Sequence, residues 1–202
     1  MYQQVITKIA TIFDEYDKTK KTPVYGFGAK SQELKLKRVS HNFYVSGDSA
    51  NPFAEGDKGI LDMYKKVLPK LEFLGPTYLS PLIKSVTNSV AARYKSDPLA
   101  YCVLVIIMDG LISDFEETIE TIIDSSEYPL SVLIVGVGDE DFHQLEFLDS
   151  DGSLLRGERQ APGPDGKPVQ IQAKRDIVQF VNYNKLSNKD EVISSALAEI
   201  PE

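Results

Sequence analysis

Apolar residues follow two different spacings along this chain, and each spacing predicts a different kind of element. Near the N-terminus, apolar side chains recur every three or four residues, so residues 3–17 are predicted to form an amphipathic helix. The lysines of "KTKK" come next, and cations suit the C-terminus of a helix. Further helices are predicted at residues 60–68, 82–94, 114–123, 139–147 and 187–200.

Two longer apolar runs lack the helical spacing and are predicted to be buried strands. These runs are "YCVLVIIMDG" at 101–110 and "PLSVLIVGVG" at 129–138. Continuous runs of this kind, rich in β-branched residues, suit strands that are covered on both faces. Shorter β-like runs occur at 22–29, 40–46 and 176–183.

The alternation of predicted strands and helices indicates an α/β fold. We expect a doubly wound, mostly parallel sheet with helices on both faces. Residues 1–202 show no internal repeat and no composition shift, so a single domain is predicted. Within it, residues 157–168 are rich in glycine, proline and charge and are predicted to form an exposed loop. Ligands of such folds bind at the carboxyl ends of the strands, where Asp109 is expected to lie.

Net charge, cysteine count and the length of the apolar runs exclude several classes of partner and environment. The formal charge of −8 argues against a nucleic-acid-binding surface and against binding anionic membranes by charge alone. Cys102 is the one cysteine, so an intrachain disulfide is impossible, and an intracellular, reducing compartment is the simplest interpretation. No apolar stretch approaches the length of a membrane span.

Catalytic motifs are missing from the sequence. It contains no Walker A motif, no GxGxxG, no CxxC and no HExxH. His41 and His143 have polar neighbours and are interpreted as surface residues, and Cys102 lies within a strand pattern and is interpreted as a buried, unreactive thiol. We therefore expect a protein that is not an enzyme.

Two side chains remain as candidate metal ligands. Asp109 ends the first apolar run, and Thr77 lies in the loop "GPTYLSP" after Gly-Pro. A hydroxyl and a carboxylate, completed by waters, suit a hard cation such as Mg²⁺. Each also has a purely structural interpretation, because Thr77 could cap the following helix and Asp109 could form a turn with Gly110.

Several long motifs in order resemble the copine family. They are "YGFGAK", "VLPKLEFLGPTYLSP", "VLVIIMDGLISD", "PLSVLIVGVGDEDF", "EFLDSDGSLLR" and "RDIVQFVNY". They are similar to the von Willebrand factor A-type domain at the copine C-terminus, from residue 2 to about residue 200. The resemblance implies a metal-ion-dependent adhesion site, in which Thr77 matches the second of three ligand segments and Asp109 the third. The ion would be Mg²⁺, or else Mn²⁺ or Ca²⁺.

The first ligand segment of that site has no counterpart here. The family places Asp-x-Ser-x-Ser on a central strand just before the first helix, and no such motif occurs in this sequence. We expect the chain to be truncated at its N-terminus, or else to be a short form whose strand is supplied by another chain. The metal site would then be incomplete and metal binding weak. Unfilled sheet edges would invite pairing, including homo-oligomer formation.

The resemblance also implies a function. Copines resemble calcium-dependent phospholipid-binding proteins because two C2 domains precede the A-type domain, and neither lies in this chain. The expected role is a non-catalytic module that recruits target proteins, in a cytoplasmic protein whose full-length form is recruited to membranes. The alternative is the substrate-recognition domain of a RING-type ubiquitin ligase, since plant ligases carry a related domain.

Overall fold

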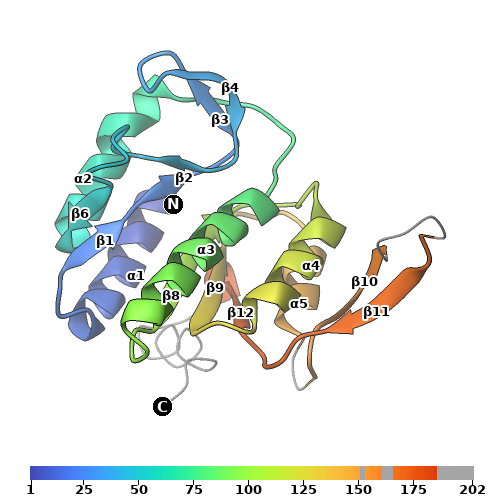
Figure 1. The fold of residues 1–202 in the computed structure, drawn as a ribbon. Coiled ribbons are helices and arrows are strands. Elements are labelled where there is room, and N and C mark those ends of the chain that lie inside the picture. The colour runs from blue at the N-terminus through green and yellow to red at the C-terminus, as the bar shows by residue number, and fades with distance from the viewer. Residues whose placement is uncertain (151–152, 161–165, 186–202) are drawn as a thin grey trace. The chain divides into compact units, whose positions relative to one another are not determined.

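A computed structural model describes residues 1–150, 153–160 and 166–185 of the chain. The chain divides into two units, Met1–Tyr78 and Leu79–Glu202 (Figure 1). Both contain helices and strands, as expected for a mixed α and β protein. The prediction of a single domain over residues 1–202 stays a prediction.

The first unit is built around two helices that pack against each other, α1 (Tyr2–Tyr16) and α2 (Gly56–Val67). The Thr11 hydroxyl of α1 donates a 3.3 Å hydrogen bond to the carboxylate of Asp57 in α2. The apolar stripe predicted from the sequence is buried, which confirms the N-terminal helix. Its buried members are Val5, Ile6, Ile9 and Ile12.

The strands of the first unit are short and antiparallel. A two-residue or three-residue strand offers few ladder hydrogen bonds, so these small sheets depend on the side chains that pack on them. They are the pair β1 (Lys21–Pro23) and β6 (Phe53–Glu55), the pair β2 (Tyr25–Gly26) and β5 (Phe43–Tyr44), and the sheet β4 (Leu36–Ser40), β3 (Ala29–Ser31) and β7 (Glu72–Phe73). The 3₁₀ turn η1 (Leu68–Lys70) follows α2.

The second unit contains a parallel sheet of the order β12–β9–β8. Strands β8 (Cys102–Met108) and β9 (Leu130–Gly136) are the two long apolar runs, and β12 (Val178–Asn182) is the third β-like run. Every residue of β9 is buried, whereas β8 alternates between buried and half-buried. The expectation that both runs are fully covered is therefore wrong for β8. The reason is its position, because among the described residues β8 pairs with β9 alone.

Helices α3 (Ser80–Ser96) and α4 (Phe115–Ser125) pack together and run in front of this sheet in Figure 1. Between them, the hydroxyl groups of Thr87 and Ser125 share a buried 2.7 Å hydrogen bond. Helix α5 (His143–Asp149) contacts β12, and η2 (Tyr183–Lys185) follows that strand.

Two further helices are predicted in this unit. A helix is predicted at 139–147, but α5 begins only at His143; just before it, the Asp141 carboxylate accepts a 3.0 Å hydrogen bond from the His143 N–H, which makes a turn. The helix predicted at 187–200 lies outside the described residues.

The predicted loop at 157–168 is wrong over its first residues. Strand β10 (Arg156–Gln160) pairs antiparallel with β11 (Pro168–Gln172), and the ribbon lies on α4. Gly157 permits this contact, since a Cβ there would come within 2.7 Å of the Ile119 Cγ2 atom. The Arg159 guanidinium then pairs with Glu120 (2.7 Å) and Asp124 (2.8 Å) of α4. Gly157 and Arg159, whose types indicated a loop, instead allow strand β10 to pack on α4.

No helix in the described part of the chain is both long enough and apolar enough to cross a membrane.

Candidate functional site

The candidate site begins where β8 ends. Asp109 directly follows Met108 and is exposed, as the sequence predicted for a strand-end aspartate. Met108 lies in register with Gly136 of β9, which lies in register with Asn182 of β12. Because parallel strands bring their carboxyl ends to one edge of a sheet, the loops that follow all three strands lie at the edge that carries Asp109.

Hydrogen bonds hold the loops at this edge. Gly138 has a positive φ of 94°, and a Cβ there would lie 3.9 Å from the Cβ of Asp109, so the loop after β9 lies beside the aspartate. The Asn184 side-chain amide donates to the Gly138 carbonyl oxygen (2.5 Å) and to the Asp139 carboxylate (3.3 Å). The Gln144 amide oxygen accepts from the Ile112 N–H at 2.8 Å. Three chain segments are thereby fixed around Asp109.

Sequence reasoning missed Asp114, a second aspartate close to this edge. Its carboxylate accepts hydrogen bonds from the backbone N–H groups of Leu79 and Ser80, each at 2.9 Å. It also accepts a 3.2 Å bond from the Thr118 hydroxyl. A carboxylate at the start of α3 neutralises unpaired N–H groups and the positive end of the helix dipole. Asp114 therefore has a structural role, which no local sequence signal could have connected to α3.

Thr77 belongs to the first unit, whereas Asp109 belongs to the second. Thr77 is half-buried and precedes Tyr78, whose N–H donates a 3.4 Å hydrogen bond to Nδ1 of His41. The rings of His41 and Tyr78 stack with centroids 4.6 Å apart. His41 is thus half-buried and positions the Thr77 loop, while His143 is exposed. The joint placement of Thr77 and Asp109 in one metal site stays a prediction.

The donor groups do not by themselves fit a tightly held cation. Within residues 1–150, 153–160 and 166–185, no three His, Cys, Asp or Glu residues lie close enough to hold a metal ion. Mg²⁺ takes near-octahedral oxygen ligands, so one carboxylate and one hydroxyl supply too few of them. No chemical step through a metal is inferred for these residues.

The thiol of Cys102 is half-buried, which is less than the sequence predicted. Burial raises its pKa, and the nearby charge of Arg93 offsets part of that increase. A raised pKa leaves less thiolate near neutral pH, and the thiolate is the nucleophilic form.

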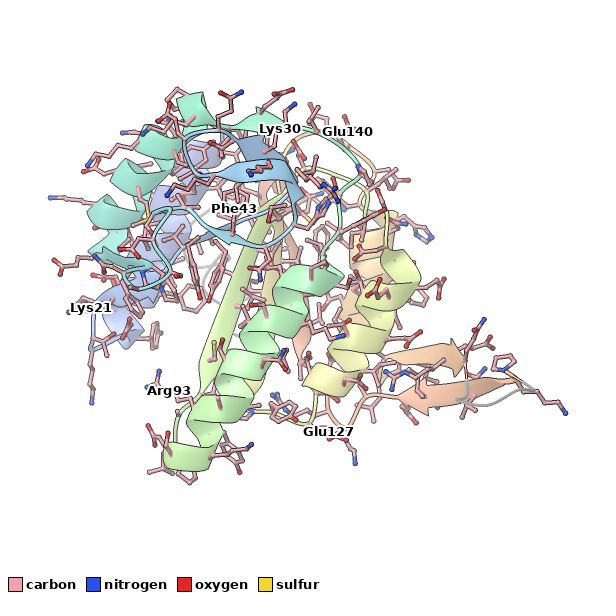
Figure 2. All side chains as sticks on the ribbon, turned by 45° about the horizontal axis from the view of Figure 1, so that its top comes forward. Lys21, Lys30, Phe43, Arg93, Glu127 and Glu140 are labelled. Carbon is pink, nitrogen blue, oxygen red and sulfur yellow. The ribbon has the colours of Figure 1, made fainter. Side chains whose placement is uncertain are left out.

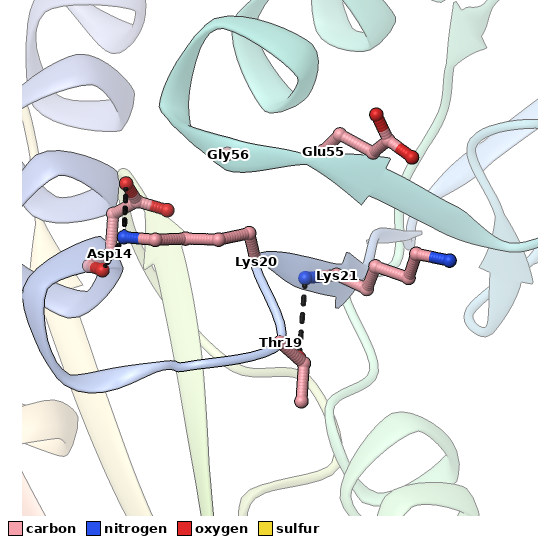
Figure 3. A pocket seen from close by; sticks show the side chains of 6 residues that line it. All are labelled: Asp14, Thr19, Lys20, Lys21, Glu55 and Gly56. Carbon is pink, nitrogen blue, oxygen red and sulfur yellow. Dashed lines mark hydrogen bonds and ion pairs between the residues drawn. The ribbon is translucent and has the colours of Figure 1, made fainter.

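An open pocket of about 500 Å³ lies in the first unit (Figure 3). In it, the Lys20 ammonium pairs with the Asp14 carboxylate at 2.8 Å, and the backbone N–H of Lys21 donates to the Thr19 hydroxyl. The lining residues are Asp14, Thr19, Lys20, Lys21, Glu55 and Gly56.

Comparison with known proteins places the chain in a family. The sequence profile of the Copine family matches residues 1–202. Protein BONZAI 2 of Arabidopsis thaliana is 37% identical over 201 residues, which are 99% of this chain and 32% of that protein. The chain therefore spans about a third of the length of this curated relative. A match along the whole chain, together with this identity, shows that the chain belongs to the copine family.

Proposed function

We propose that this chain is a non-catalytic protein-interaction module of a copine, which recruits target proteins. The observation that carries the proposal is the match to the Copine family over residues 1–202, the full extent of the chain. The candidate site supports it, because the edge around Asp109 is a set of loops held on a parallel sheet, and such loops commonly carry binding function.

The loops at that edge are fixed by hydrogen bonds, which favours a binding role over a catalytic one. Asn184, Gln144 and Asp114 each fix a loop or helix end through hydrogen bonds of 2.5–2.9 Å. A surface that is ordered before the partner arrives loses less conformational entropy on binding. The Asp109 carboxylate projects from this surface as an exposed, negatively charged group.

We further propose an adhesion-type metal site that is only partial in this chain. Thr77 and Asp109 would be ligands for Mg²⁺, or for Mn²⁺ or Ca²⁺, and would bind the ion weakly. The complete doubly wound sheet of an A-type domain would need another strand beside β8, which pairs with β9 alone among the described residues. A strand from another chain, including a second copy, could take that place.

For the whole protein we propose calcium-dependent binding to phospholipids through C2 domains. The protein would then be cytoplasmic and recruited to membranes, where this module would present its targets. The net charge of the module itself is negative, which disfavours its binding to anionic membranes by charge alone.

Proximity labelling tests the recruiting role. The chain is fused to a biotin ligase in cells, and labelled proteins are quantified against the ligase alone. We expect a reproducible set of enriched proteins, of which at least one binds the purified chain directly. Labelling no different from that by the ligase alone, or enriched proteins that all fail to bind the purified chain, would contradict the proposal.

A further inference from the structure

One face of the second unit combines exposed apolar side chains with glutamates that form no ion pair among the described residues. From Ser96 to Leu155 the sequence contains no lysine and no arginine, although aspartate and glutamate recur throughout. This segment supplies β8, α4, β9 and α5. Cations from outside it neutralise some of its acids, since Arg159 pairs with Glu120 and Asp124 and Lys185 pairs with Glu146. A long acidic stretch in a folded unit creates a field that attracts cationic partners.

The apolar part of the face is a pair of phenylalanines. The rings of Phe115, at the start of α4, and Phe147, in α5, meet edge to face with centroids 5.6 Å apart. Phe147 is 49% exposed, and Leu111, in the loop before α4, is 60% exposed. The Gln144 bond to the Ile112 N–H fixes that loop to α5. We call Leu111, Phe115 and Phe147 the aromatic face.

Three glutamates lie next to residues of the aromatic face, in the chain or in space. Glu116 and Glu117 follow Phe115 in the first turn of α4. Glu140 lies near Gly110, which precedes Leu111, since a Cβ on Gly110 would lie 4.0 Å from the Glu140 Cγ atom. None of these three glutamates forms an ion pair with any residue that the structure describes. Their charge is therefore available to a partner.

We infer that the aromatic face and its glutamates bind a basic, amphipathic segment of a partner protein. Apolar side chains of the segment would cover Phe147 and Leu111, and its lysines or arginines would pair with Glu116, Glu117 and Glu140. Aromatic side chains are frequent anchors of protein interfaces. The negative field disfavours nucleic acid and anionic membranes as occupants of the same face. This inference rests on the proposed recruiting function and names the chemistry of the target.

A defined peptide probe tests it. A fluorescent peptide of about 18 residues, with leucines at helical spacing and lysines between them, is titrated with the full chain and followed by anisotropy. One control peptide replaces each leucine by serine, and a second replaces each lysine by glutamate. We expect the first peptide to bind at least about tenfold more tightly than either control.

Variants of the chain locate the binding face. Phe147→Ser and Glu140→Lys should each weaken binding of the probe by about tenfold. Their matched controls are Leu99→Ser, at a side chain that is 94% exposed before β8, and Glu127→Lys, before β9. Figure 2 labels Glu140 and Glu127 at opposite ends of this unit. If the Phe147 variant fails to fold by circular dichroism, Leu111→Ser replaces it.

The outcomes separate this inference from the recruiting role. Equal binding to the variants and their controls, or to all three peptides, would overturn the inference. Recruited proteins that bind Phe147→Ser as tightly as wild type would also overturn it while leaving the recruiting role intact. If the probe binds selectively and the face variants lose this binding, the inferred binding surface is supported even when no cellular protein is enriched.

Discussion

The carboxylate of Asp114 accepts a 2.9 Å hydrogen bond from the backbone N–H of Ser80, a residue 34 positions earlier in the chain. The other carboxylate oxygen accepts from the Leu79 N–H, also at 2.9 Å. The residue that precedes α4 thus caps the start of α3, and the two helices are joined at the same edge as the candidate site. The side chain is partly buried, so its bonds are shielded from water.

Replacement of Asp114 by alanine should destabilise the fold. Two backbone donors at the start of α3 would lose a charged acceptor in a partly buried place, which we expect to cost about 2–3 kcal/mol of unfolding free energy. Urea unfolding followed by circular dichroism measures the change in midpoint. Asp97→Ala, which removes one exposed bond to the Leu99 N–H, is the control and should cost under about 1 kcal/mol. Equal losses for both variants would show that Asp114 does not act through α3.

Gly157→Ala should lower stability through a clash with α4. The added Cβ would lie 2.7 Å from the Ile119 Cγ2 atom, and overpacking of this kind costs about 1–3 kcal/mol. A double-mutant cycle with Ile119→Ala should recover part of the loss, because the clashing atom is then gone. Gly110→Ala is the control, since its Cβ would meet Glu140 only at 4.0 Å. Additive losses in the cycle would rule out the contact as the cause.

Sequence patterns predicted the long elements because the pattern of apolar residues within each element is local. The runs at 101–110 and 129–138 became β8 and β9, and the stripe from Val5 to Ile12 became the buried side of α1. Their parallel pairing also followed, since helices separate the strands along the chain. An element of this kind can be predicted from its own residues, without knowing which distant residues it contacts.

The missed features depend on distant partners. Gly157 and Arg159 indicated a loop by composition, but they belong to a strand that pairs with β11 and packs on α4. Asp114 was predicted only as the start of its own helix, yet its carboxylate accepts from the N–H groups of Leu79 and Ser80 at the start of α3. The candidate metal ligands show the same limit, because Thr77 and Asp109 were matched by motif and their joint placement stays a prediction. The type of a side chain shows which ligands or hydrogen-bond partners it can accept, whereas the fold determines which residues actually contact it.

The thiol of Cys102 should react slowly with iodoacetamide. Burial raises its pKa above the ordinary value of about 8.5, with Arg93 opposing the change, so the folded protein holds less thiolate than a free cysteine at pH 8–9. The unfolded chain loses this proton first, so the contribution of Cys102 to stability is present below the ordinary pKa and declines as pH rises above it. Alkylation rates of the folded and urea-unfolded chain, followed by mass spectrometry, measure the difference. A folded rate equal to the unfolded rate would contradict the raised pKa.

Metal titration examines the partial adhesion-type site. Calorimetry with Mg²⁺ or Mn²⁺ should give no dissociation constant tighter than the millimolar range, since one carboxylate and one hydroxyl leave most of the coordination shell to water. Any weak heat that is observed should disappear in Asp109→Asn and in Thr77→Val, and should persist in Asp141→Asn, whose carboxylate already accepts from the His143 N–H. Micromolar affinity would mean that further oxygen ligands assemble around Asp109. Heat that persists in both ligand variants would place the ion elsewhere, and the two residues would then serve the structural roles of loop and strand end.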